Sequence, residues 1–141
     1  MGSRRQSREL ALQAIFQSDF SETWESANLA FCLKHFGASE SVVTYASHLC
    51  EGVIANKDRI DEIITVASQR WSLSRMARVD RSIIRLATYE IALMPEVPPR
   101  VAINEAIEVA KRFGTEDSPQ FINGVLDKIA SNLEATAEEA A

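Results

Sequence analysis

Apolar positions recur every three to four residues along most of the chain, and no segment alternates apolar and polar residues over a useful length. Because this spacing places side chains on one face of a helix, the pattern predicts an all-α fold of about seven helices. Glycine and proline are few and stand between the periodic segments. The predicted helices cover about residues 4–18, 24–36, 40–55, 57–70, 75–94, 100–113 and 119–134.

Residues with strong preferences for helix ends mark several of these boundaries. Ser39 and Ser74 are expected to cap the helices that follow them. Residues 111–121, "KRFGTEDSPQF", contain a stop signal followed by a start signal. Gly114 is expected to end the sixth helix, and Ser118, followed by a proline, to cap the seventh.

The most polar interruption between strongly periodic segments is "QRWSLS", residues 69–74. It predicts an N-terminal helical subdomain at 1–70 and a C-terminal one at 71–134, with Trp71 packed near the boundary. Both would belong to one globular unit. The Ala/Glu-rich tail, 135–141, is expected to fray.

A helical projection of the last helix places Phe121 at the margin of its apolar stripe, in line with Gly124 and Lys128. An aromatic ring beside a glycine and a cation could offer a stacking platform with a partner for a phosphate. The alternative is an ordinary core residue at the edge of the stripe.

The first helix has a comparable flank, where Leu12 and Phe16 lie in line with Arg5. Apolar surface beside a basic end suits a protein partner that docks next to a polyanion. A wide core-facing surface is the alternative.

Two carboxylates of the fifth helix lie on or near its apolar arc, Glu90 near the middle and Asp80 toward one edge. Because a buried carboxylate must find donors, Glu90 is expected to bind a helix N-terminus or an arginine inside the fold. We interpret Glu90 as structural.

The chain has 141 residues, 46% of them hydrophobic, and a net charge of −5 from 15 basic and 20 acidic residues. A bulk polyanion binder is therefore not expected, although Arg4, Arg5 and Arg8 crowd the N-terminus and could form a local basic patch. The start of the chain is charged and no apolar run reaches the length of a membrane span. We expect a soluble, cytoplasmic protein without a disulfide framework, since it has two cysteines.

The sequence gives little support for a catalytic or metal-binding site. Cys32 with His35, and His48 with Cys50, have a metal-like composition, but residues two apart on a helix do not share a face. The sequence has no glycine-rich phosphate loop, GxSxG or HExxH motif. We expect neither an enzyme nor a cofactor.

Three segments carry a resemblance to a known family. "RRQSRELALQAIFQSDF", "VDRSIIRLATYEI" and above all "PPRVAINEAIEVAKRFGTEDSPQFINGVLDKIA" resemble the bacterial NusB family of transcription antitermination factors. The resemblance implies two packed, roughly perpendicular helical bundles. It also implies a heterodimer with NusE, a small-subunit ribosomal protein, that binds boxA RNA in nascent transcripts, notably of ribosomal RNA operons. RNA polymerase and other Nus factors complete the implied antitermination complex.

The resemblance extends to individual positions. Arg4, Arg5 and Arg8 match the family's arginine-rich RNA-binding start, and the RNA-facing rim is matched by Phe113, Asp117 and Phe121, with Lys128 nearby. Asp117 would either moderate RNA affinity or accept a hydrogen bond from a base amino group. NusE would be met by Phe16 and Asp80, with Leu12 on the same flank.

Three alternatives stay open at this point. One is the NusB-like domain of ribosomal RNA cytosine methyltransferases, for which the chain leaves no room for a cofactor-binding domain. Another is a helical interaction module that self-associates without binding RNA. The free protein could also be either a monomer or a homodimer.

Overall fold

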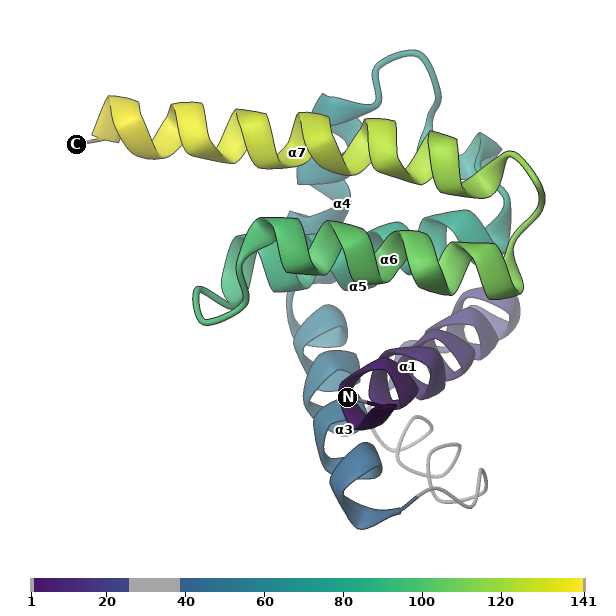
Figure 1. Cartoon of the computed structure of the whole chain (residues 1–141). Coiled ribbons are helices and arrows are strands. Elements are labelled where there is room, and N and C mark those ends of the chain that lie inside the picture. The colour runs from purple at the N-terminus through teal and green to yellow at the C-terminus, as the bar shows by residue number, and fades with distance from the viewer. Residues whose placement is uncertain (1, 26–38, 141) are drawn as a thin grey trace.

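The computed structural model describes residues 2–25 and 39–140 (Figure 1). The helices are α1 (Gly2–Ser21), α3 (Glu40–Ala55), α4 (Lys57–Ala67), α5 (Arg78–Leu93), α6 (Pro99–Phe113) and α7 (Ser118–Ala140), with a short 3-10 helix, η1 (Leu73–Arg75), before α5. Helix is the only regular structure in these residues, which confirms the predicted all-α class. Of the helix predicted at 24–36, residues 26–36 lie outside the described part of the chain.

Several predicted helix boundaries are wrong by three residues or more: α1 continues to Ser21 instead of ending near 18, and α4 ends at Ala67 instead of near 70. The helix expected to follow Ser74 begins only at Arg78, because the chain is extended at Met76, whose side chain is buried in the core. The last helix does not end near residue 134 but continues through Ala140. Alanine and glutamate have high helix propensity, which favours this extension even though its side chains are exposed.

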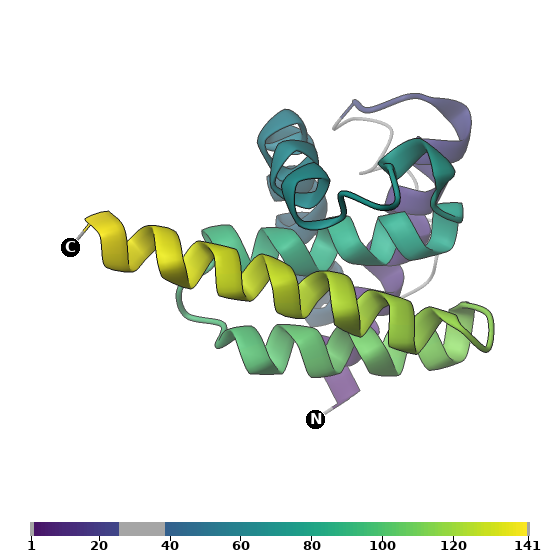
Figure 2. The same ribbon diagram turned by 90° about the horizontal axis from the view of Figure 1, so that it is seen from above.

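The helices form two groups that cross steeply. In Figure 1, α5, α6 and α7 run roughly horizontally, whereas α3 and α4 run across them. In the turned view of Figure 2, α7 crosses α5 and α6, and it packs against both. α1 packs against α3 and α5. This arrangement agrees with the expected pair of roughly perpendicular bundles.

One hydrophobic cluster includes side chains from every one of these α-helices. The stripe predicted for α7 is buried as expected, at Ile122, Val125, Leu126 and Ile129. The cluster joins residues on both sides of the predicted subdomain boundary near residue 70. Within the described ranges, no helix is long and apolar enough to cross a membrane.

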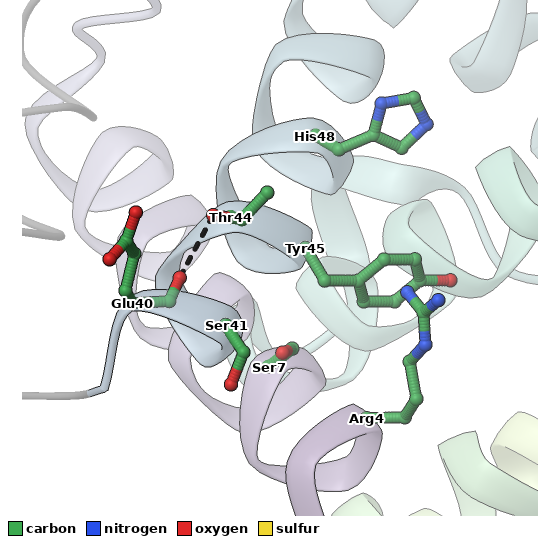
Figure 3. Close-up of a pocket in the computed structure, with 7 residues that line it drawn as sticks. All are labelled: Arg4, Ser7, Glu40, Ser41, Thr44, Tyr45 and His48. Carbon is green, nitrogen blue, oxygen red and sulfur yellow. Dashed lines mark hydrogen bonds between the residues drawn. The ribbon is translucent and has the colours of Figure 1, made fainter.

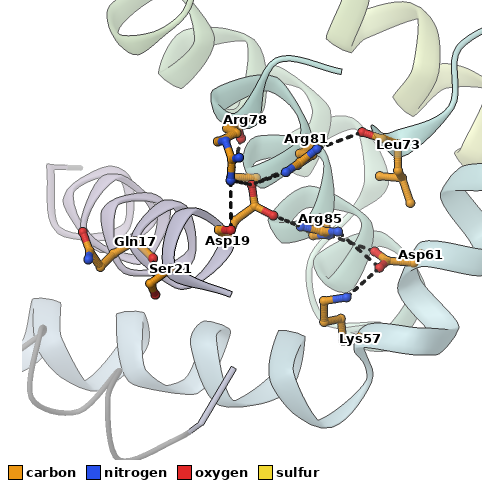
Figure 4. Close-up of polar contacts among 10 residues, drawn as sticks. Gln17, Asp19, Ser21, Lys57, Asp61, Leu73, Arg78, Arg81 and Arg85 are labelled. Carbon is orange, nitrogen blue, oxygen red and sulfur yellow. Dashed lines mark hydrogen bonds and ion pairs between the residues drawn. The ribbon is translucent and has the colours of Figure 1, made fainter. Parts of the chain in front are cut away.

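A buried ionic network fixes the end of α1 against α4 and α5 (Figure 4). The Asp19 carboxylate accepts hydrogen bonds from Arg81 Nε at 2.9 Å and Arg85 Nη1 at 3.1 Å. Arg78 donates to the Asp19 carbonyl, and Arg85 also donates to Asp61 at 2.8 Å. Because a buried carboxylate is stable only with donors around it, these contacts hold α1 in one position.

Candidate functional site

The three N-terminal arginines of α1, which the sequence groups together, have three different environments. Arg4 is exposed, and its guanidinium carbon lies 3.7 Å from the centroid of the Tyr45 ring of α3, in cation–π contact. The two residues border an open hollow of about 830 Å³ (Figure 3). The lining residues are Arg4, Ser7, Glu40, Ser41, Thr44, Tyr45 and His48. Sequence reasoning missed Tyr45, because nothing in the local pattern reveals that α3 packs beside the start of α1.

Arg5 is also exposed but is held by α6. Its Nη2 and Nε donate to the two carboxylate oxygens of Glu105 at 2.8 and 3.1 Å. The hydrogen bond from Arg5 lowers the pKa of the Glu105 carboxyl, and burial opposes this shift without reversing it. Since 47% of the Arg5 side chain is exposed, the guanidinium still presents cationic surface to solvent.

Arg8 is buried, which does not favour the RNA contact predicted for it. Its Nη2 and Nε donate to the Glu90 carboxylate at 2.8 and 3.0 Å, and Tyr45 donates to the same carboxylate at 2.8 Å. Burial lowers the pKa of Arg8, but the hydrogen bonds and charge of Glu90 raise it by more. Burial, followed by the charge of Glu90, raises the pKa of Tyr45 to about 12, so this hydroxyl remains a donor. The prediction that Glu90 binds an arginine inside the fold is confirmed.

The α6–α7 joint depends on a serine and a glycine, though not as predicted. Ser118 is the first residue of α7 rather than its cap, and its hydroxyl accepts from the Thr115 N–H at 2.9 Å and donates to Asp80 at 2.6 Å. Gly114 ends α6 with ordinary extended backbone, so a left-handed conformation does not explain it. A Cβ there would lie 2.5 Å from Ser118 Oγ, so the glycine is required by close packing.

The predicted rim residues follow this joint. Phe113 is half-buried, with the Arg112 guanidinium carbon 5.2 Å from its ring centroid, while Asp117 is exposed directly before α7. Phe121 is half-buried one turn into α7. The side chains therefore stand around the joint, and their contact with RNA remains a prediction.

Phe121 and Lys128 also line a groove that the sequence did not reveal. The opposite wall comes from residues 66–71, the end of α4 and the start of its connection to η1, and includes Arg70 and Trp71. Trp71 is 47% exposed in this groove, although it was expected to pack near the subdomain boundary. The only sign of this groove in the sequence was Trp71 itself, a large aromatic residue within the polar segment 69–74.

Of the residues predicted to meet a protein partner, Leu12 is the least accessible. It is 3% exposed and belongs to the core, so the wide core face was the right alternative for it. Phe16 is half-buried and stacks on Phe20, which is 64% exposed and lies under the Arg78 guanidinium. Asp80 is partly buried and accepts the hydrogen bond from the joint serine.

The metal-like residues of α3 lie in different environments, as their spacing predicts. Cys50 is buried, while His48 is exposed. Cys32 and His35 fall outside the described residues. Among residues 2–25 and 39–140, no group of three His, Cys, Asp or Glu side chains could hold a metal ion.

Comparisons with known proteins agree on one family. A family model described as "NusB family" matches residues 5–131. A transcription antitermination protein NusB from Geotalea uraniireducens is 50% identical over 141 residues, covering 94% of this chain and 97% of its own. The protein of the same name from Geobacter sulfurreducens is 50% identical over 135 residues, with the same coverage.

Solved structures give the same result for the fold. T. maritima NusB superposes with a TM-score of 0.82 at 38% identity, covering 91% of this chain and 90% of its own. A crystal structure of antitermination factors NusB and NusE in complex with dsRNA has a TM-score of 0.82 at 21% identity, covering 94% and 98%. The second likeness concerns the fold alone.

Proposed function

Because this chain belongs to the NusB family, we propose that it is a transcription antitermination factor that binds boxA RNA as a heterodimer with NusE. The observation that carries this proposal is the match along nearly the full chain to proteins named for transcription antitermination, at 50% identity. The resemblance in the N-terminal and C-terminal segments supports it independently of the fold.

The proposed RNA surface starts at the exposed N-terminus of α1 and continues to the α6–α7 joint. Arg4 and Arg5 would hold phosphates, since arginine donors position a nucleic acid without reading its sequence. Phe113 and Phe121 would stack unpaired bases, the usual mode of sequence-specific RNA recognition. Asp117 would face the same strand. Lys128 remains in the proposal as a phosphate contact, whereas Arg8 does not.

The proposed NusE surface lies at the other end of α1. Phe16 and Phe20 form a stacked aromatic pair with one ring largely exposed, and apolar patches of this kind suit a protein partner. Asp80 would contribute at its edge. The solved complex of NusB and NusE shares this fold and supports the pairing.

The protein would act by binding rather than by catalysis, within an antitermination complex that includes RNA polymerase and other Nus factors. Bacterial transcription takes place in the cytoplasm, so we place the protein there. We retain the subdomain division near residue 70 as part of this proposal.

A gel-shift titration with boxA RNA, with and without purified NusE, tests the proposal. We expect weak binding alone and stronger binding with NusE, while a scrambled RNA of equal length binds weakly in both cases. A mass measurement of the free protein separates monomer from homodimer. Self-association without any boxA binding in the presence of NusE would support the interaction-module alternative and contradict the proposed function.

A further inference from the structure

The groove between residues 66–71 and α7 contains Arg70 and Trp71, to which the proposed function gives no role. Its volume is about 500 Å³, within the range of small-ligand sites. Six of the lining side chains or backbone positions matter here: Arg70, Trp71, Gln120, Phe121, Gly124 and Lys128. The wall carrying Trp71 lies beside the first half of α7, since the same groove is lined by Gln120, Gly124 and Lys128.

Two aromatic rings from different parts of the chain contribute to this groove. Trp71 comes from the connection before η1 and Phe121 from the first turns of α7. About half of the Trp71 surface, 47%, stays accessible to solvent. Flat aromatic surface that stays accessible is what a nucleic-acid base requires for stacking.

The charges of the groove have one sign, although the protein as a whole carries −5. Arg70 and Lys128 line it, and no carboxylate is among the lining residues. Within the described ranges neither cation belongs to an ion pair, whereas Arg5, Arg8 and Arg85 are all paired. Arg70 and Lys128 could therefore bind phosphates, while the rings of Trp71 and Phe121 could stack on a base.

Gly124 supplies an independent reason to place a ligand here. A glycine inside a helix is less stable than alanine by about 0.5–1 kcal/mol, so a folding advantage must normally come from close packing. At Gly114 that packing exists, but a Cβ built at Gly124 meets no described atom within 4 Å beyond its chain neighbours and the adjacent backbone of its own helix. Among the described residues, no close contact therefore explains why a glycine stands here, and we read it as room for a molecule that approaches from outside.

We propose that this groove holds an unpaired base of the bound RNA, stacked on Trp71 and Phe121 over the bare backbone at Gly124. Arg70 and Lys128 would contact its flanking phosphates. The inference rests on the proposed function, because Phe121 belongs both to the predicted rim and to the groove. The groove therefore extends the RNA surface from the α6–α7 joint toward the α4–η1 connection.

Tryptophan fluorescence tests the stacking directly. The chain has two tryptophans, so Trp24→Phe leaves Trp71 as the single reporter. Titration with boxA RNA flanked by four unpaired adenosines on each side, in the presence of NusE, is expected to quench Trp71. In gel shifts, Trp71→Ala should bind this RNA about 5-fold to 100-fold more weakly than the parent.

Gly124→Ala provides a second test with effects of opposite sign on stability and binding. The added methyl meets no protein atom, so the melting temperature should rise by about 2–3 °C through helix propensity. The same methyl would intrude on the base and lower RNA affinity by about fivefold. Ser131→Ala, on an exposed position of α7 outside the groove, should leave RNA affinity unchanged.

The outcomes separate the inference from the proposed function. Parent protein that fails to bind the RNA with NusE would overturn the function itself. Normal RNA binding by Trp71→Ala and Gly124→Ala, without quenching of Trp71, would overturn the groove assignment and leave the function intact. Normal RNA binding by Trp71→Ala together with lost NusE binding would assign the groove to the protein partner and also overturn the inference.

Discussion

Replacement of Arg8 by methionine is predicted to destabilise the fold while leaving RNA recognition unchanged. The methionine keeps most of the apolar stem, so the substitution removes chiefly the charge and its donors. Only 2% of the Glu90 side chain is exposed, and two nitrogens of Arg8 lie within 3.0 Å of its carboxylate. Arg8→Met therefore leaves a buried carboxylate without its cation.

The expected cost follows from this geometry. Breaking a buried ion pair by removing one partner typically costs about 3–5 kcal/mol. Tyr45 still donates to Glu90, which favours the lower end, about 3 kcal/mol, from a total stability of about 5–15 kcal/mol. For a chain of this size the melting temperature should fall by about 10 °C.

Urea denaturation followed by circular dichroism measures this change, with Arg5→Met as the matched control from the exposed pair. The control should shift the midpoint little. Adding Glu90→Gln to Arg8→Met should recover part of the loss, because no buried charge is then left alone. A loss below about 1 kcal/mol, or a further loss in the double variant, would refute the reasoning.

Four further predictions concern the site. Arg5→Ala should weaken boxA binding, and the slope of log affinity against log salt concentration should become shallower by about one, the contribution of one phosphate contact. An unchanged slope would mean that Arg5 does not contact a phosphate. Asp117→Asn should tighten binding if this carboxylate moderates affinity, and unchanged or weaker binding at fixed salt would exclude that role. Gly114→Ala should cost about 1–3 kcal/mol in urea denaturation, because its Cβ collides with Ser118 Oγ, and equal stability would contradict the packing argument. The lowered pKa of Glu105 means that its stabilising contribution is present above about pH 4.5 and is lost as pH falls through the folded-state pKa. Melting curves of parent and Glu105→Gln should therefore differ at pH 7 and converge as the pH falls below the lowered folded-state pKa of Glu105.

The sequence predicted the helices well where local signals decide the structure. The stripe from Ile122 to Ile129 is buried as its spacing indicates, and the helix predicted at 40–55 has those bounds. The start of α5 could not be read locally, because burial of Met76 delays the helix and depends on tertiary packing. The extension of α7 beyond residue 134 agrees with the high helix propensity of the alanines and glutamates at 135–140, whereas the prediction treated these residues as a chain end.

The candidate site was harder to predict, because partners far away in the sequence decide which of its side chains are buried and which are exposed. Arg5 and Arg8 look equivalent in sequence, yet glutamates 100 and 82 residues away leave one exposed and bury the other. A helical projection gives the direction of Leu12 but not what packs against it, and α1 turned out to be covered on that side. Trp71 acquires a neighbour in Phe121 only when the α4–η1 connection folds back onto α7.

The pairing of α1 with later helices also orders events during synthesis. Glu90 and Glu105, which hold Arg8 and Arg5, follow them by 82 and 100 residues, and Arg81 follows Asp19 by 62. During translation the basic start of the chain thus leaves the ribosome long before its acidic partners exist. Contacts between residues so far apart in the sequence form slowly, and the earlier segments stay exposed until their partners have been synthesised. α1 is therefore made before the helices that supply its ion-pair partners and is held in place by them only late.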